Sequence, residues 1–78
     1  MRLIRISPTL EKTGDTRSPH YAKIAAGLFT EPVKIGLRAA AWPEHEVDAL
    51  IAARVAGKTS DEIRALVEKL HEARKVAA

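Results

Sequence analysis

The residue types that could support catalysis or metal binding form no recognisable constellation in this sequence. The chain has no cysteine, which excludes a disulfide, a thiol nucleophile and the cysteine-based zinc sites. His20, His45 and His71 share no spacing typical of metal ligands. We find no Ser-His-Asp order, no paired carboxylates in an apolar context and no glycine-rich phosphate loop. We therefore expect no enzymatic activity, no cofactor and no metal.

Basic side chains in the first half of the chain point instead to a polyanionic partner. Residues 1–42 carry seven basic and three acidic side chains, whereas residues 43–78 carry six basic and seven acidic ones. The positive charge is therefore concentrated in the first half, and a basic surface attracts nucleic acid.

Four of these side chains suit different parts of a DNA duplex. Arg17 has the forked donor geometry that matches guanine O6 and N7, and Lys23 and Lys34 suit phosphate oxygens. Arg38 suits a narrow minor groove. Each also has a simpler interpretation as a solvated surface side chain, and Arg17 has a second one as the partner of Asp15.

The size of the chain favours binding at a surface over binding in a pocket. Seventy-eight residues form one domain, and a single Trp, Tyr, Phe and Met leave little core to spare for a small-molecule pocket. No apolar run approaches the roughly 20 residues of a membrane span, and the apolar stretch at the N-terminus is too short for a signal peptide. We expect a cytoplasmic protein without a membrane partner or a small-molecule substrate.

Residues 3–28 predict a brief strand or an extended arm, followed by two short helices. Residues 3–6 include two β-branched isoleucines and precede Ser7-Pro8, a pair that suits an N-cap and first helical position. This helix should end at Gly14. The second helix begins after Thr16 or after Ser18, of which we prefer Thr16, and ends at Gly27. Two short helices joined by a glycine-containing turn form a helix-turn-helix unit. The apolar spacing predicts that the second helix buries one stripe, which comprises Tyr21, Ile24, Ala25 and Leu28.

Residues 32–57 predict a β-hairpin and a third helix. Residues 32–35 and 39–42 are the strands, joined by Gly36-Leu37-Arg38 with Arg38 at the tip. Trp42 should pack between the hairpin and a helix that begins at Pro43 and ends at Gly57. Acidic residues at the start of that helix are explained by its dipole. Its apolar stripe is predicted to comprise Val47, Leu50, Ile51 and Val55.

A fourth helix follows, with a capping box formed by Thr59 and Glu62. Its apolar positions are Ile63, Leu66, Leu70, Ala73 and Ala77, and Val67 widens the stripe. The chain therefore predicts a mainly α fold with a small β-hairpin, a winged helix-turn-helix with an additional C-terminal helix. We assign residues 1–57 to the DNA-binding domain and residues 58–78 to a helix that packs on that domain or on a dimer partner. We favour a homodimer, which would bind paired half-sites about one helical turn apart.

An ordered set of short motifs resembles a known family. The motifs are Thr13-Gly14, Arg17-Ser18 before Tyr21, Ala26-Gly27-Leu28-Phe29, Pro32-Val33-Lys34-Ile35-Gly36, Ala41-Trp42 and Glu46-Val47-Asp48-Ala49. Over about residues 2–55 the chain is similar to the AlpA-type phage regulatory proteins, relatives of the excisionases and of the MerR-type DNA-binding heads. It departs from them at four places, namely Asp15, Pro19-His20, Ala22 and Thr30.

The resemblance implies transcriptional regulation at prophage or mobile-element promoters, or excisionase-like help in recombination through DNA bending. It places the second helix in the major groove and the hairpin against the minor groove or backbone. It puts Arg17, Ser18 and Tyr21 where the family's recognition helix meets DNA and Arg38 where its wing does. Lys23 and Lys34 would position the duplex, and Arg17, Ser18 and His20 would contact bases. The complete predicted DNA-binding set is Thr16, Arg17, Ser18, His20, Tyr21, Lys23, Lys34 and Arg38.

Three functions remain distinct hypotheses at this point. The first is a sequence-specific regulator that binds double-stranded DNA, and the second is a recombination directionality factor that bends it. The third belongs to another class, a protein-interaction module that uses the C-terminal helix. The operator sequence, the direction of regulation and the oligomeric state are not encoded in any pattern we recognise.

Overall fold

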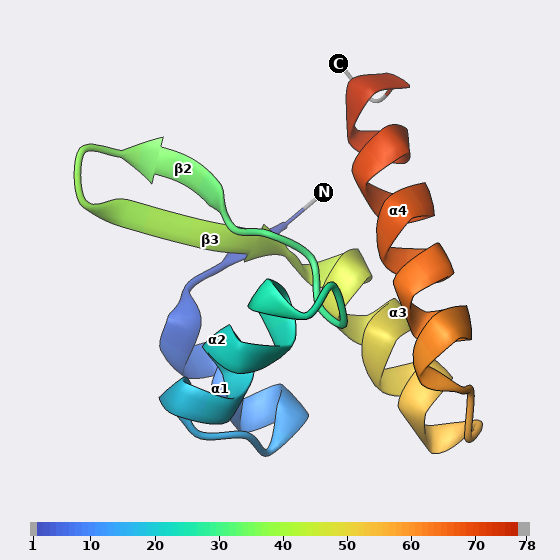
Figure 1. Cartoon of the computed structure of the whole chain (residues 1–78). Coiled ribbons are helices and arrows are strands. Elements are labelled where there is room, and N and C mark those ends of the chain that lie inside the picture. Colours follow the sequence, from blue (N-terminus) through green and yellow to red (C-terminus); the bar gives the residue numbers. More distant parts are fainter. Residues whose placement is uncertain (1, 77–78) are drawn as a thin grey trace.

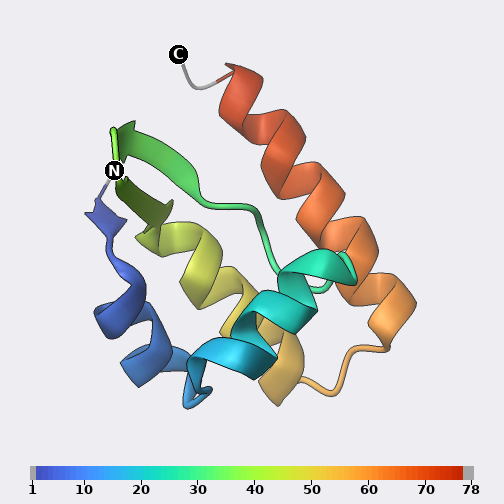
Figure 2. The same ribbon diagram turned by 60° about the vertical axis from the view of Figure 1, so that its left-hand side comes forward.

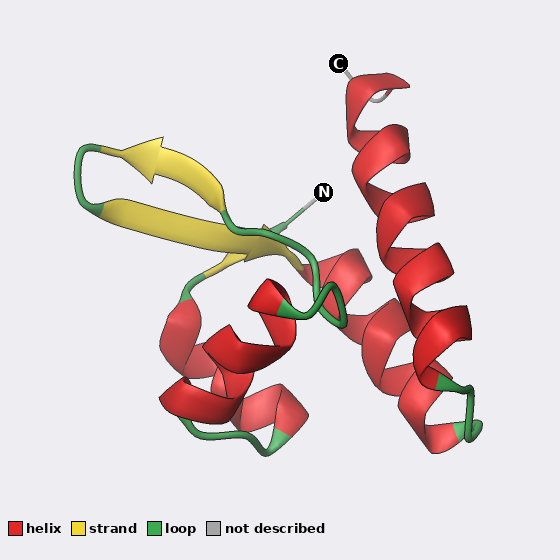
Figure 3. Cartoon of the chain, viewed as in Figure 1, coloured by secondary structure: helices red, strands yellow, loops and turns green. Residues whose placement is uncertain are grey.

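Four helices and three short strands make up the computed structural model, which describes residues 2–76 (Figure 1). Their order is β1 (Leu3–Ile4), α1 (Ile6–Thr13), α2 (Arg17–Ala25), β2 (Val33–Gly36), β3 (Ala39–Pro43), α3 (Glu44–Val55) and α4 (Ser60–Val76). Figure 3 shows the helical majority and the small sheet. The predicted fold class, mainly helical with a hairpin between the second and third helices and an additional helix at the end, is confirmed. No helix within residues 2–76 is long and apolar enough to cross a membrane.

The sheet is antiparallel, with β3 in the centre. Strand β1 pairs with one edge of β3 through Ile4 and Trp42, and β2 pairs with the other edge through Val33 and Ala41. Ile4 is buried, so the N-terminal strand is anchored in the core and is not a free arm. The β2–β3 hairpin extends away from the helices (Figure 1).

Glycines end the first two helices as the sequence predicts. Gly14 and Gly27 both have φ of 77°, the left-handed conformation that glycine adopts without steric cost. Thr16 is the N-cap of α2, as preferred. Helix α1 begins at Ile6, earlier than the predicted cap at Ser7. The early start is tolerated because the first four helical N–H groups have no intrahelical acceptor, so Pro8 loses no hydrogen bond in that turn.

One hydrophobic core joins the sheet to α3 and α4. Trp42 is fully buried at its centre, and its Nε1–H donates to the Thr30 carbonyl at 2.9 Å. The other buried members of this core are Ile4, Phe29, Val47, Leu50, Ala53, Ile63 and Val67. The predicted packing of Trp42 between the hairpin and the third helix is therefore confirmed.

The buried face of α3 differs from the predicted stripe. Val55 is 84% exposed, whereas Glu46 and Ala53 are buried. The apolar pattern alone suggested a face centred on Val47 and Ile51. Helix α4 packs against the Glu46 and Ala53 side, which rotates the buried face away from Val55.

Helix α4 begins with the predicted capping box. The Thr59 N–H donates to Glu62 Oε1 at 3.0 Å, and the Glu62 N–H donates to Thr59 Oγ1 at 3.2 Å. The hydrogen bond from the Thr59 backbone, with a smaller contribution from the Thr59 side chain, lowers the pKa of the Glu62 carboxyl. Figure 2 shows α4 along one side of the molecule and the sheet at the other.

The inward face of α4 contains an arginine where an alanine was predicted. Ile63 and Val67 are buried and Leu70 is half-buried, but Ala73 is exposed and Arg74 turns inward. Ala77, also placed on the predicted stripe, lies outside the described residues. The sequence pattern missed Arg74 because a cation at that helical position is expected to face solvent.

Arg74 forms a buried ion pair that the sequence did not predict. Its Nε and Nη2 donate to the two carboxylate oxygens of Glu46 at 2.8 and 2.6 Å, and Nη2 also donates to the Glu31 carbonyl at 2.7 Å. The Glu31 N–H donates to His71 Nε2 at 3.1 Å. The last turns of α4 therefore hold the segment that leads into the hairpin. Glu46, interpreted from the sequence as a dipole partner, is a buried half of this pair.

Candidate nucleic-acid interface

The N-terminal half of α2 presents polar side chains to solvent. Thr16, Arg17 and Ser18 are exposed in the first turn, directly after the glycine turn that joins α1 to α2. This end of the helix also carries free backbone N–H groups and the positive end of the helix dipole, both of which favour a phosphate. The three residues therefore occupy a surface with the chemistry to meet a DNA backbone and the edges of bases.

Ile24 and Leu28 pack against the core as predicted, but the other two positions of the predicted α2 stripe face solvent. Tyr21, expected in the core by its ring, is 46% exposed, and Ala25 is exposed as well. His20 is fully buried in their place. Its ring meets Phe29 at a centroid distance of 4.7 Å and Trp42 at 5.0 Å, both edge to face. A periodicity count treats histidine as polar and so overlooks an imidazole that packs as an aromatic ring.

Burial removes His20 from the candidate interface. Its exposed fraction is zero, and within residues 2–76 neither ring nitrogen has a hydrogen-bond partner. Burial lowers the pKa of His20, with a smaller opposing effect of Asp15, so the ring is neutral near pH 7. The hypothesis that His20 contacts bases conflicts with this position, since no part of the side chain reaches the surface. Tyr21 takes its place on the outer face, 5.5 Å from the His20 ring.

Lys23 is partly neutralised by an ion pair across the helix-turn-helix. Its Nζ lies 2.6 Å from Asp15 Oδ2, and both side chains are about one-fifth exposed. Asp15 is therefore the partner of Lys23 rather than of Arg17. The pair ties the turn to the third turn of α2 and reduces the charge that Lys23 offers to a phosphate. Their separation of eight residues spans the turn, so the i, i+4 rule for helices could not reveal it.

The hairpin carries two basic side chains and an exposed apolar tip. Lys34 and Arg38 are exposed, Ile35 is 45% exposed and Leu37 is fully exposed. The predicted position of Arg38 in the connection between the strands is observed. The exposed side chain of Leu37 was not singled out by sequence reasoning, although its place in a two-residue connection was the available signal.

Positive charge without a carboxylate partner is concentrated on α2 and the hairpin. Within residues 2–76, Arg17, Lys34 and Arg38 form no ion pair, whereas most other basic side chains do. The other basic residues without an ion pair in this part of the chain are Arg5, Arg54 and Lys69. A surface that keeps its charge unpaired attracts anions more strongly than one of equal formal charge with internal pairs.

Helix α4 leaves this surface open. Its contact with α2 lies at the C-terminal end, where Arg64 Nε donates to the Ala26 carbonyl at 3.0 Å and the Arg64 side chain approaches Gly27. The exposed first turn of α2 lies at the opposite end of that helix. Figures 1 and 2 both show the hairpin projecting on the side away from α4.

Two helices joined by a glycine turn, followed by a basic hairpin, define a winged helix-turn-helix protein with an additional C-terminal helix. The family model described as "Prophage CP4-57 regulatory protein (AlpA)" matches residues 2–55, and the chain belongs to this family. The resemblance found in the sequence is thereby confirmed. The match ends at the last residue of α3, so α4 lies beyond it. No curated protein and no solved structure matches the chain.

Proposed function

We propose that this protein binds double-stranded DNA in a sequence-specific manner and regulates prophage or mobile-element genes. Helix α2 enters the major groove, and the β2–β3 hairpin lies against the adjacent minor groove. Family membership supports a regulatory role, since the family is described as a prophage regulatory protein. The observation that carries DNA binding is that Arg17 on α2 and Lys34 and Arg38 on the hairpin form no ion pair within residues 2–76.

Each exposed residue has a role suited to its chemistry. Arg17 donates to guanine through its fork, and Ser18 and Thr16 donate hydroxyl hydrogen bonds to bases or phosphate. The Tyr21 hydroxyl and Lys34 meet phosphates, with Lys23 as a weaker contributor because Asp15 already pairs with it. Arg38 enters the minor groove.

A mobility-shift titration against the DNA upstream of the native gene tests this proposal. Arg17→Ala should weaken specific binding by about 1–3 kcal/mol and relax the preference at one base pair. Lys75→Ala, which removes an exposed charge near the end of α4, is the control and should leave binding unchanged. A wild-type protein that binds this fragment no better than unrelated DNA would refute sequence-specific recognition.

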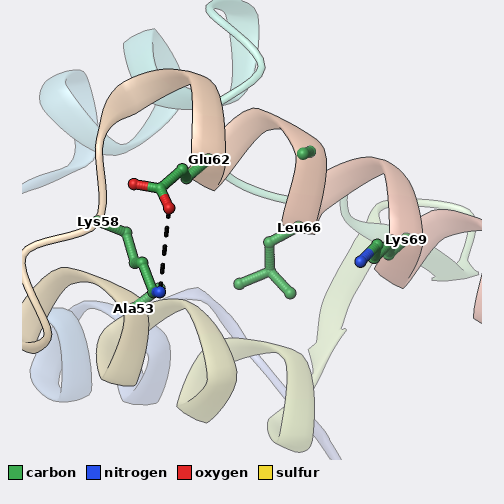
Figure 4. A pocket seen from close by; sticks show the side chains of 6 residues that line it. Ala53, Lys58, Glu62, Leu66 and Lys69 are labelled. Atoms are coloured by element: carbon green, nitrogen blue, oxygen red, sulfur yellow. Dashed lines mark ion pairs between the residues drawn. The ribbon is translucent and has the colours of Figure 1, made fainter.

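We also propose that two copies associate through α4, so that paired half-sites are bound together. A groove of about 300 Å³ runs between α3 and α4 and is lined by Ala53, Lys58, Glu62, Ala65, Leu66 and Lys69. Figure 4 shows Leu66 pointing into it beside the Lys58–Glu62 ion pair. The buried stripe of α4 is already occupied by the chain's own core, so an association surface has to use this adjacent face.

Analytical ultracentrifugation tests the dimer. Ala65→Arg adds a large cation to an exposed groove position without touching the core, and it should convert a dimer to a monomer. If both proteins sediment as monomers, the groove is left to a different partner, and the protein-interaction module becomes the hypothesis to pursue for α4.

A further inference from the structure

The tip of the hairpin presents an apolar side chain with no contact to the rest of the protein. Leu37 is as exposed as a residue in an extended peptide, with a relative accessibility of 102%. It lies in the connection between β2 and β3, and the hairpin formed by these strands extends away from the helices (Figure 1). A leucine in this position contributes nothing to folding through burial, so its side chain is available to a ligand.

The hairpin around Leu37 is slender and bent. Strand β3 opens with three alanines, Ala39, Ala40 and Ala41, so the ribbon has little side-chain bulk on that strand. An irregularity in the pairing with β2 between Lys34 and Gly36 leaves Ile35 outside the regular register. Bulges of this kind bend a strand and redirect its side chains. The ribbon ends in a connection of only two residues, so this end is the part of the hairpin that can enter a groove about 6 Å wide, the width of the DNA minor groove.

The charge around the tip favours an anionic partner over a basic or neutral one. Residues 32–43 contain no acidic side chain, and Lys34 and Arg38 flank the tip without an ion pair among residues 2–76. Arginine is favoured in narrow minor grooves, and the lysine can reach a phosphate on the groove wall. The apolar tip therefore suits the stacked bases inside a duplex, and its basic flanks suit the walls of the groove.

We infer that Leu37 is a wedge that enters the minor groove, partly separates two stacked base pairs and bends the DNA. This inference rests on the proposed function and adds a mode of recognition to it. Apolar side chains inserted between base steps kink DNA by about 20–90° towards the major groove. Pyrimidine–purine steps unstack most easily, so the wedge adds a preference for such a step at a position without hydrogen-bond contacts to bases.

A wedge predicts two measurable effects, a bend in the DNA and tighter binding to a mismatched duplex. The wild-type protein should bend the fragment upstream of its gene, as measured by circular-permutation mobility shift. It should also bind more tightly, by roughly tenfold, when a mismatched pair at the wedge position lowers the cost of unstacking. Leu37→Ala should keep the specific complex but lose most of the bend and most of the preference for the mismatch. Leu37→Met, which retains a long apolar side chain, should keep both.

Two controls separate the failure of this inference from the failure of DNA binding. Val55→Ala removes another largely exposed apolar side chain, at the end of α3, and should behave as wild type. Arg17→Ala should lose specific affinity for the matched and the mismatched duplex alike. If the wild-type protein binds and Leu37→Ala bends DNA to the same angle, the wedge is wrong and the proposed function stands. If the wild-type protein binds neither duplex, the wedge and the proposed DNA binding are both wrong. Binding to vesicles or to a protein that is lost in Leu37→Ala would then assign the tip to that partner.

Discussion

Replacing Arg74 with methionine removes both hydrogen bonds that reach the carboxylate of Glu46. That carboxylate belongs to a side chain with no exposed surface, while Arg74 is one-quarter exposed. Breaking a buried pair from one side costs about 3–5 kcal/mol because the remaining charge stays buried without compensation. A domain of 78 residues has a total stability of roughly 4–12 kcal/mol. Arg74→Met should therefore remove a large share of the stability and leave a partly unfolded population at 37 °C.

Urea unfolding followed by the fluorescence of Trp42 measures this directly, because that indole is buried at the centre of the core. Lys75→Met is the matched control: it breaks an exposed pair with Glu72 on the same helix and should cost at most about 1 kcal/mol. Removing both members of the buried pair, with Glu46→Leu added to Arg74→Met, should recover much of the loss. A free energy of unfolding for Arg74→Met within about 1 kcal/mol of the wild-type value, at an unchanged denaturant slope, would contradict this prediction.

Three further predictions concern groups described above. Burial lowers the pKa of His20 in the folded protein, so at a pH below the ordinary histidine pKa of about 6.5 the unfolded chain binds more protons than the folded one. The His20 contribution to stability is therefore full above that pH and declines below it. His20→Phe should flatten this decline in urea midpoints measured between neutral and mildly acid pH, and an unchanged decline would point to another group. Thr59→Ala removes one half of the capping box and should cost about 1 kcal/mol by thermal unfolding, whereas no change would mean that packing alone holds this end of α4. Asp15→Asn releases Lys23 from its ion pair and should steepen the salt dependence of DNA binding by about 0.9 in the log–log slope; an unaltered slope would show that Lys23 does not reach the phosphates.

Local signals account for what the sequence predicted well. Gly14 and Gly27 end helices because the residue after the helix adopts the left-handed conformation, which glycine allows without steric cost. The capping box is a pattern of two residues three positions apart, Thr59 and Glu62. A tight connection containing Arg38 was predicted from Gly36 and the extended residues on both sides; the structure extends β2 by one residue, to Gly36. Such features depend on chain chemistry within a few positions and need no knowledge of the rest of the fold.

What the sequence could not predict depends on contacts between distant segments. His20 occupies the core where Tyr21 was predicted, because Phe29 and Trp42 create an aromatic environment that accepts a neutral imidazole. The Arg74–Glu46 pair joins positions 28 residues apart, and the placement of α4 that brings them together also turned Val55 outward. In the candidate interface, residue types identified the basic positions, but only the structure separated Arg17 from the paired Lys23.

The most direct test of the central claim compares the salt dependence of DNA binding for two lysines, one on the hairpin and one on α4. If each protomer neutralises about four phosphates, log K falls with log salt at a slope near −3.6. Lys34→Ala should reduce the magnitude of that slope by about 0.9, and Lys75→Ala should leave it unchanged. Equal slopes for both variants, or a wild-type affinity that hardly responds to salt, would contradict the assignment of α2 and the hairpin as a DNA-binding surface.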